Sequence, residues 1–167
     1  MAPSFDNGSS LFNFVVRDGN GFKGIVDSGI SKVPQANIQP PAEQIDKNNA
    51  SKHGQPPIDL SRLDGPDHDE VAKEIVRAAE TLGFFQVVNH GVPVDLLESL
   101  KDTAHNFFGL PVERKGVYRT EVSPTPLVKY GTSFVPAKEK ALEWKDYISM
   151  VYTNDAEVLE HWPIECR

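Results

Sequence analysis

Cysteine is nearly absent from this chain, since Cys166 is the single thiol among 167 residues. An internal disulfide needs two cysteines, so the 167 residues hold none, and this usage is typical of a reducing compartment. A thiol beside the last residue is also a poor nucleophile, because a terminal residue is hard to hold in an oriented, desolvated site. We therefore expect a cytoplasmic protein and no cysteine-based catalysis.

Positive charge and long apolar runs are also scarce. The chain has 17 Lys and Arg against 24 Asp and Glu, a formal net charge of −7 at pH 7. An acidic chain is not attracted to phosphate backbones or anionic lipids, so we expect no nucleic acid and no membrane as partners. No apolar run approaches the ~20 residues of a membrane span. The opening MAPSFDNGSS lacks the basic stretch and apolar core of a signal peptide.

Motifs of nucleotide and ester chemistry are missing. The chain contains neither the G-x-S-x-G of hydrolases nor the G-x-x-x-x-G-K-[ST] phosphate loop. Gly19-Asn20-Gly21 lacks the preceding strand and the remainder of a dinucleotide fingerprint. The paired carboxylates, such as Asp67 with Asp69, fall in turn-like segments. Taken alone, these residues identify no catalytic constellation.

Histidine is the remaining candidate for metal chemistry. A non-haem iron site needs two histidines and a carboxylate on one face, and His68-Asp69-Glu70 has the H-x-E form of the first half. Two ligands at positions i and i+2 share a face on a strand, whereas on a helix their side chains point about 200° apart around the axis. We therefore favour a helix-start role for His68 and a fold-corner role for His90 in Asn89-His90-Gly91. The other histidines have no partner at ligand spacing: His53, His105 and His161.

The clearest secondary structure begins after Pro57. Ile58-Asp59-Leu60 is a strand candidate, and Asp67 with Glu70 resembles a capping box that starts a helix. Gly83 is expected to end this helix, and 84–88 (FFQVV) predicts an interior strand. The apolar stripe of the helix falls at helical spacing: Val71, Ile75, Ala78, Ala79 and Leu82.

A second helix follows Pro93. It is expected to end with Gly109 in the left-handed C′ position, before Pro111. Residues 111–134 are expected to be loop-rich, and 141–153 predict a further strand. The order of elements indicates an α/β fold whose sheet is too small to stand alone. The predicted apolar face of the helix consists of Leu97, Leu100, Ala104, Phe107 and Phe108.

Four strings in order carry a family resemblance: PPIDLS (56–61), AAETLGFFQVVNHGVP (78–93), HNFFGLPVERK (105–115) and YGTSF with ALEWKDY (130–147). They resemble the N-terminal domain of plant iron(II)- and 2-oxoglutarate-dependent dioxygenases. Residues 19–40 and the terminal WPIECR extend this resemblance over nearly the whole chain, and together with the 130–147 strings they are similar to the coumaroyl-CoA and feruloyl-CoA ortho-hydroxylases.

The resemblance implies a helix-and-strand domain of a non-haem dioxygenase that lacks most of the C-terminal jelly-roll (double-stranded β-helix) barrel. It implies an N-terminal extension and connector at 1–55, the dioxygenase N-terminal domain at 56–160, and the start of the connection to the barrel at 161–167. The family takes its iron ligands from an H-x-D and a later His, and its 2-oxoglutarate clamp from an R-x-S. All of these lie C-terminal to the matching region, so we expect no catalytic, cofactor-binding or metal-binding residue here. Iron(II), 2-oxoglutarate and ascorbate would serve the complete protein, with none bound to this chain alone.

The resemblance also implies one wall of a substrate pocket. The segment around Y-G-x-x-F would bring Tyr130, Ser133 and Phe134 near the organic substrate, with Trp144 and Tyr147 on the next strand. Packing of these aromatics against the barrel is an equally good interpretation. The implied function is ortho-hydroxylation of a hydroxycinnamoyl-CoA thioester, toward simple coumarins. The alternatives are a truncated, non-catalytic binding protein, and a sister dioxygenase acting on a flavonoid or hormone.

Overall fold

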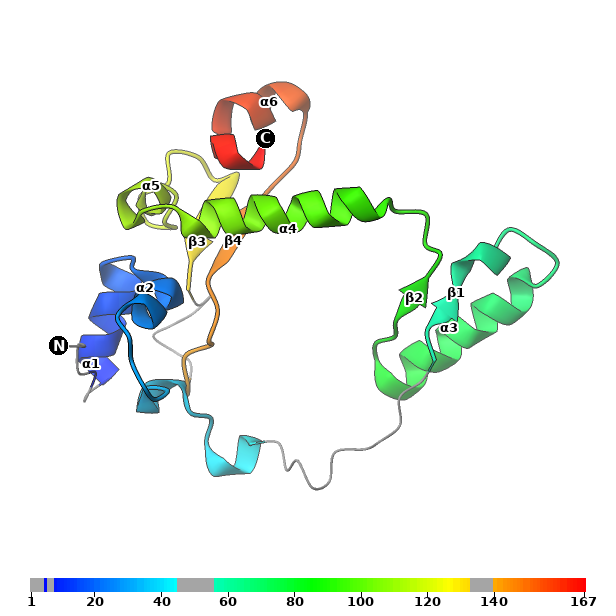
Figure 1. Ribbon diagram of the computed structural model, residues 1–167, viewed down its shortest axis with the longest axis horizontal. Helices are drawn as coiled ribbons and strands as arrows, with labels where there is room; N and C mark the ends of the chain where they lie inside the picture. The colour runs from blue at the N-terminus through cyan, green and yellow to red at the C-terminus, as the bar shows by residue number, and fades with distance from the viewer. Residues whose placement is uncertain (1–4, 6–7, 45–55, 133–139) are drawn as a thin grey trace. The chain divides into compact units, whose positions relative to one another are not determined.

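The structure is a computed structural model that describes residues 5, 8–44, 56–132 and 140–167 (Figure 1). The chain divides into two compact units, one formed by residues 1–44 with 101–167 and the other by residues 45–100. Each unit is built around its own two-stranded sheet. This mixture of helices and small sheets agrees with the predicted α/β class, while the domain boundaries at residues 55 and 160 stay a prediction.

The unit of residues 45–100 contains a β-α-β element. Strand β1 (Ile58–Asp59) pairs in parallel with β2 (Val87–Val88), and α3 (His68–Leu82) connects them. The core of this unit holds Ile58, Val71 and Ala78, so the predicted apolar stripe is partly confirmed. Gly83 ends α3 with φ 76°, as predicted, because a left-handed residue there is unstrained only for glycine.

Two predictions for this unit are wrong. Asp67 does not cap α3 through its side chain; the carboxylate instead lies 3.2 Å from Arg62 Nε, and Glu70 pairs with Lys73. Residues 84–86 lie outside the strand, and Phe84 is 74% exposed. A two-residue parallel ladder is too short to bury the preceding aromatics, so β2 is not an interior strand within the described residues.

Three helical turns begin the other unit. They are α1 (Gly8–Phe12), a π-turn over Asn13–Arg17 and α2 (Gly21–Asp27). Their apolar side chains form a core with a residue from far along the chain. The helical turns of residues 8–27 therefore pack together with Leu142, while the division into an N-terminal extension and connector at 1–55 stays a prediction. The buried members are Leu11, Val15, Phe22, Ile25 and Leu142.

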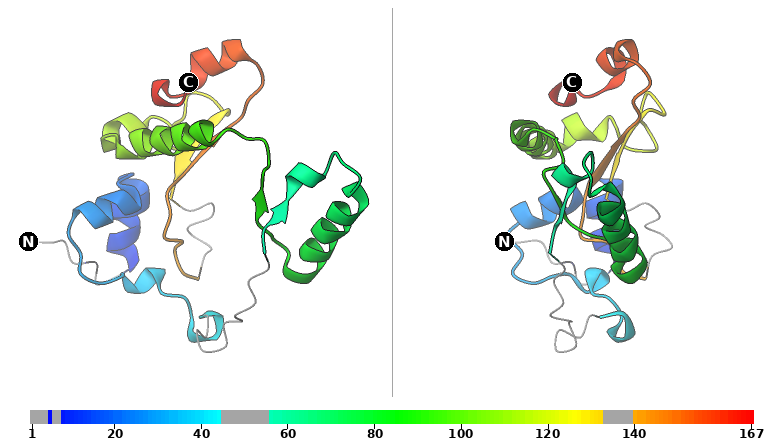
Figure 2. Two further views of the ribbon diagram at one scale, coloured as in Figure 1. Left: turned by 45° about the vertical axis from the view of Figure 1, so that its right-hand side comes forward. Right: turned by 90° about the vertical axis from the view of Figure 1, so that its right-hand side faces the viewer.

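The sheet of this unit is an antiparallel ladder of β3 (Val128–Gly131) and β4 (Tyr147–Met150), and Figure 2 shows the strands side by side in both views. The ladder confirms the strand predicted within 141–153, although it is shorter. The prediction of a loop-rich 111–134 is wrong in part, because α5 (Val112–Gly116) and β3 both lie there.

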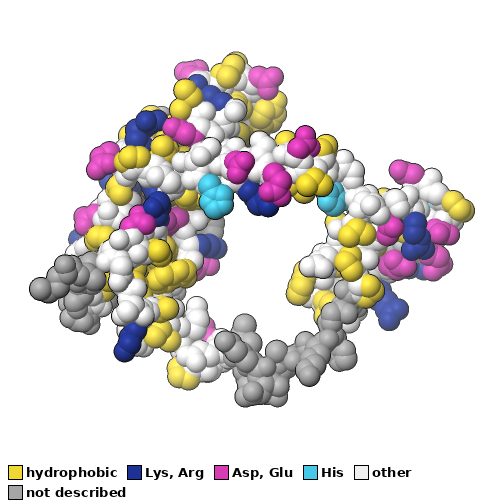
Figure 3. Space-filling view, in the orientation of Figure 1, with side chains coloured by type: hydrophobic (Ala, Val, Ile, Leu, Met, Phe, Trp, Pro, Cys, Tyr) yellow, Lys and Arg dark blue, Asp and Glu magenta, His cyan; other side chains and the backbone are white. Residues whose placement is uncertain are grey.

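Helix α4 (Val94–Gly109) runs from one unit into the other. Phe107 is fully buried, but Leu100 is 65% exposed, so the predicted stripe faces solvent over its first half. Figure 3 shows hydrophobic side chains between charged ones along this helix. Gly109 is the last helical residue and has no positive φ, so the C′ prediction is wrong.

The chain then forms α6 (Asp155–His161), a helix that the sequence analysis did not predict. Its start is set by Asn154, whose side-chain oxygen accepts a hydrogen bond from the Glu157 backbone N–H at 3.1 Å. Among the described residues, none of the helices is both long and apolar enough to cross a bilayer.

Candidate functional site

Tyr130 lies at the centre of the β3–β4 unit and is 2% exposed. Its ring centroid is 5.9 Å from that of Phe107 in α4, an edge-on contact that favours aromatic pairs. Burial raises the pKa of the Tyr130 phenol far above its usual range. The phenol oxygen has no hydrogen-bond partner within the part of the chain that the structure describes. Tyr130 therefore keeps its proton, and its hydroxyl is unpaired among the described residues.

Lys115 of α5 packs beside this tyrosine and is 1% exposed. Its ammonium group donates to the Phe108 carbonyl at 2.8 Å and lies 5.7 Å from the Tyr130 ring centroid, within cation–π range. Loss of solvent lowers the pKa of Lys115, because burial disfavours the charged form. The lysine thus stabilises the end of α4 at a desolvation cost.

Asp146 holds the N-terminal helices to the sheet. Its carboxylate accepts from the Phe22 backbone N–H at 2.9 and 3.1 Å and from the Thr132 hydroxyl at 2.9 Å. It also accepts from the Lys23 backbone N–H at 3.4 Å. The first turn of α2 has free N–H groups that its own backbone cannot satisfy, and this distant carboxylate satisfies them.

The contact depends on glycine at position 21. Gly21 has φ 65°, and a Cβ built there would lie 2.5 Å from Asp146 Oδ2. Any side chain would therefore push the carboxylate away from the N–H groups that it accepts from.

The predicted wall residues take different places in this unit. Trp144 is 44% exposed, and its ring centroid lies 4.7 Å from that of Phe22. Tyr147 is half-buried opposite Gly131 in the ladder, with its phenol oxygen 3.0 Å from where a Gly131 Cβ would be. Ser133 and Phe134 lie outside the described residues. The role of all five in lining a substrate pocket stays a prediction.

A partly enclosed cavity of about 100 Å³ brings Tyr130 and Tyr147 together. Arg119 also lines it, and its guanidinium donates through one Nη to the Arg17 carbonyl. The sequence analysis missed both Arg119 and Asp146. Neither has a clear local signal, because Arg119 meets the Arg17 carbonyl and Asp146 meets the Phe22 N–H, each more than a hundred residues earlier in the chain.

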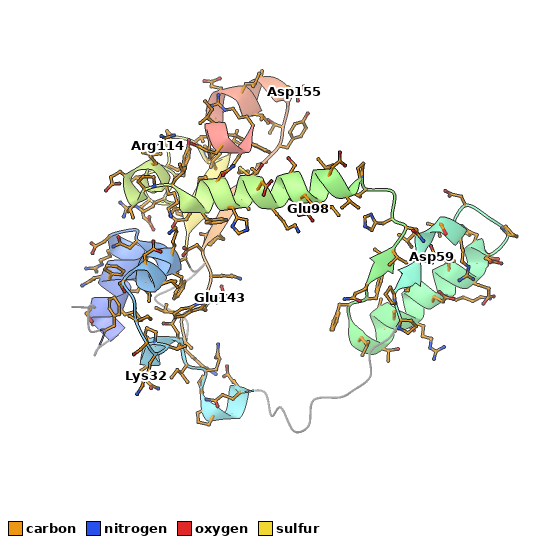
Figure 4. All side chains as sticks on the ribbon, viewed as in Figure 1. Lys32, Asp59, Glu98, Arg114, Glu143 and Asp155 are labelled. Atoms are coloured by element: carbon orange, nitrogen blue, oxygen red, sulfur yellow. The ribbon has the colours of Figure 1, made fainter. Side chains whose placement is uncertain are left out.

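Two of the described histidines, His68 and His90, make local backbone contacts. His90 Nδ1 accepts from the Val92 backbone N–H at 3.1 Å, and His68 Nδ1–H donates to the Leu63 carbonyl at 2.7 Å. The preceding Asn89 has φ 53° and donates to Asp59 of β1, which is labelled in Figure 4, at 2.9 Å. This hydrogen bond is the main cause of a lowered pKa at Asp59. These contacts agree with the corner and helix-start roles predicted for the two histidines.

The described residues do not fit an iron site. No group of three His, Cys, Asp or Glu side chains among them is placed to hold a metal ion. No step at a metal is therefore assigned to this chain.

Comparison with known proteins identifies the family. Residues 56–165 match the family described as non-haem dioxygenase in morphine synthesis, N-terminal. The whole chain is 62% identical over 168 residues to scopoletin 8-hydroxylase of Arabidopsis thaliana. It is 44% identical over 174 residues to feruloyl CoA ortho-hydroxylase 1 of the same plant, and 44% over 178 residues to a bifunctional coumaroyl CoA and feruloyl CoA ortho-hydroxylase of Ruta graveolens.

The chain spans 47% of the length of each of these three relatives. The likeness covers all of this chain, including the helices before residue 56. It confirms the resemblance drawn from the four ordered strings and from residues 19–40. The chain belongs to the non-haem dioxygenases and carries the N-terminal domain of that family.

Proposed function

We propose that these residues form the N-terminal part of an iron(II)- and 2-oxoglutarate-dependent hydroxylase that acts on the aromatic ring of a hydroxycoumarin such as scopoletin. The supporting observation is the 62% identity to scopoletin 8-hydroxylase, against 44% to the feruloyl CoA ortho-hydroxylase, over the whole chain in both cases. In the complete protein, iron(II), 2-oxoglutarate and dioxygen would supply the oxidising chemistry, and ascorbate would keep the iron reduced; this chain would hold none of them. The sequence analysis had not considered a free coumarin as the substrate.

A second candidate is the predicted ortho-hydroxylation of feruloyl-CoA or coumaroyl-CoA. It is supported by relatives of that name in two plants, matched over the entire chain. Both candidate substrates carry a planar ring with a phenolic oxygen, so one pocket wall suits either. Substrate choice between such close relatives rests on few side chains.

The contribution of this chain is one wall of the substrate pocket. Tyr130, Trp144 and Tyr147 would pack against the ring and exclude water, and Ser133 and Phe134 would extend the wall. Asp146 is a positioning residue, because it ties Thr132 at the end of β3 to helix α2. The wall would face a C-terminal barrel, which is the expected partner of this chain. We place the protein in the cytoplasm because of its single cysteine.

A chimaera tests this proposal against a non-catalytic binding role. Residues 1–167 would be joined to the part of Arabidopsis scopoletin 8-hydroxylase that follows its matched region. With iron(II), 2-oxoglutarate and ascorbate, we expect scopoletin-dependent succinate and a hydroxylated coumarin, both measured by mass spectrometry. Feruloyl-CoA serves as the second substrate, and a higher kcat/KM for it would favour the second candidate. A folded chimaera that turns over neither substrate, while the intact relative is active, would contradict the proposal.

A further inference from the structure

The cavity beside β3 contains donors without partners. Two of the residues that line it carry a buried polar atom with no hydrogen-bond partner in the described ranges: Arg119 Nε and Tyr130 Oη. A buried donor left unpaired costs about 1–3 kcal/mol, so such atoms call for an acceptor. The Arg119 Nε–H can only donate, which makes an oxygen acceptor its matching group.

Arg119 is held in one place rather than free to swing. One Nη donates to the Arg17 carbonyl, and the Cδ lies 3.0 Å from where a Cβ of Gly19 would be. Gly19 is buried and has φ 74°, so its backbone forms a close wall against the arginine stem. A fixed guanidinium loses little freedom when a ligand binds, which favours recognition of a specific oxygen.

Another part of the lining is aromatic. The Tyr147 ring lies against Gly131, with Cε1 and the phenol oxygen each 3.0 Å from the position of a Gly131 Cβ. Both residues line the cavity. A tyrosine ring over bare backbone makes a planar surface that suits another planar ring.

Size and charge limit the occupant. A cavity of about 150 Å³ holds benzene, so one of about 100 Å³ admits the edge of a ring with its oxygen, and not a nucleotide. Its lining also includes the exposed carboxylate of Glu121, so Arg119 is not part of a cluster of cations. A multiply charged phosphate would meet one arginine and one carboxylate in a chain of net charge −7.

We propose that Arg119 is a specificity-determining residue, whose Nε–H donates to a phenolic or lactone oxygen at the edge of the planar aromatic substrate, in the cavity between Gly19 and Tyr147. This inference rests on the proposed function and adds to it the residue that orients the ring. It assigns the coenzyme A part of a thioester substrate to another region of the protein. Arg119 is not a catalytic residue in this proposal, because it holds the ring by an edge oxygen.

Binding to the 167-residue chain is the first test, since it needs no turnover. Scopoletin would be titrated by its own fluorescence against the wild type, Arg119→Gln and Arg119→Lys. Arg114→Gln is the matched control, because Arg114, labelled in Figure 4, is an exposed arginine that pairs with Glu165 and does not line the cavity. We expect R119Q to weaken binding about tenfold, R119K to weaken it less, and R114Q to leave it unchanged.

Two further ligands test the chemistry of the contact. If Arg119 contacts the phenolic oxygen, coumarin without a ring hydroxyl should bind more weakly than scopoletin; if it contacts the lactone oxygen, coumarin should bind as well as scopoletin and lose affinity in R119Q. Free coenzyme A should not compete. Equal binding of scopoletin to the wild type and R119Q, both folded by circular dichroism, would overturn the proposal. Competition by coenzyme A would overturn it too, and so would a wild type that binds no scopoletin, in which case the cavity holds water only.

The chimaera separates this inference from the proposed function. R119Q in the chimaera should raise KM for scopoletin about tenfold with a smaller change in kcat. An active chimaera whose KM is unaffected by R119Q would leave the proposed function standing and refute the role of Arg119. A folded chimaera that turns over neither substrate, while the intact relative is active, would refute the proposed function, and the binding titration would still decide the role of Arg119.

Discussion

Removing the Asp146 carboxylate should release the N-terminal helices from the sheet. In Asp146→Ala the Phe22 N–H and the Thr132 hydroxyl both lose their acceptor, at 2.9 Å each. Phe22 is buried, so its amide is not readily rehydrated. The stacked Trp144 should lose order with it, because its ring packs on Phe22.

The size of the effect follows mainly from the two shorter contacts, those with the Phe22 N–H and the Thr132 hydroxyl. A hydrogen bond to a charged group contributes about 1.5–3 kcal/mol, and an orphaned buried donor costs about 1–3 kcal/mol. Half-burial of Asp146 reduces both values, so we expect a loss of about 3 kcal/mol in the free energy of unfolding. Thr132→Val removes one of the two contacts and should cost about 1 kcal/mol. Asp146→Asn keeps an acceptor for the Phe22 N–H and should fall between the two.

Urea unfolding measures the total loss, and hydrogen exchange locates it. In Asp146→Ala the amides of residues 21–24 should exchange faster, while those of α3 in the other unit keep their protection. The double variant with Thr132→Val should show coupling, since both changes remove the same contact. A loss below about 0.5 kcal/mol, or unchanged exchange at residues 21–24, would refute the idea that this carboxylate holds α2 in place.

Gly21→Ala should lower the free energy of unfolding by at least about 2 kcal/mol more than Gly29→Ala, because both glycines have positive φ but only Gly21 abuts Asp146, whereas Gly29 has open space. Tyr130→Phe should leave the free energy of unfolding unchanged or raise it by up to about 1 kcal/mol, and an alkaline titration of this variant at 295 nm should lose its last step. Because the pKa of Tyr130 is raised in the folded state, the stability of the wild type should fall as the pH rises above 10. Lys115→Met should have a free energy of unfolding about 1 kcal/mol higher than that of the wild type at pH 7. Because the pKa of Lys115 is lowered in the folded state, wild-type stability rises as the amine loses its proton, so this difference should narrow toward pH 10.5. A difference that stays constant with pH would contradict this. Iron(II) titrated into the 167-residue chain in a calorimeter should show no stoichiometric site, and a tight one-to-one isotherm would prove this wrong.

Local signals predicted much of the unit of residues 45–100. Helical spacing located α3, and a glycine at its end set the stop, because both depend on neighbours within a few residues. The capping box was wrong since Arg62, five residues before Asp67, offers its carboxylate an ion pair instead. The strand at 84–88 was overextended because β-propensity reflects packing, and the two-residue ladder with β1 supplies little.

The candidate site was harder to predict because its contacts are distant in sequence. The family strings indicated Tyr130, Trp144 and Tyr147, and these lie on or beside β3 and β4. Nothing near Asp146 indicates that it meets Phe22, 124 residues earlier. Arg119 likewise reaches the Arg17 carbonyl, 102 residues away, a contact that only the fold reveals.

The long reach of Asp146 affects the order in which the chain can fold during synthesis. Helix α2 leaves the ribosome well before residue 146 is made, and at about 5–20 residues per second the delay is roughly 6–25 s. Over that time the N–H groups at the start of α2 lack the Asp146 carboxylate, and the apolar face of α2 lacks Leu142. By contrast, β1, α3 and β2 lie within one short stretch and can pair as soon as they emerge. The nascent α2 segment therefore waits longer for its partners than the β1-α3-β2 element does and is open to chaperones and premature association for that time, so substitutions there should affect yield as well as the stability of the finished fold.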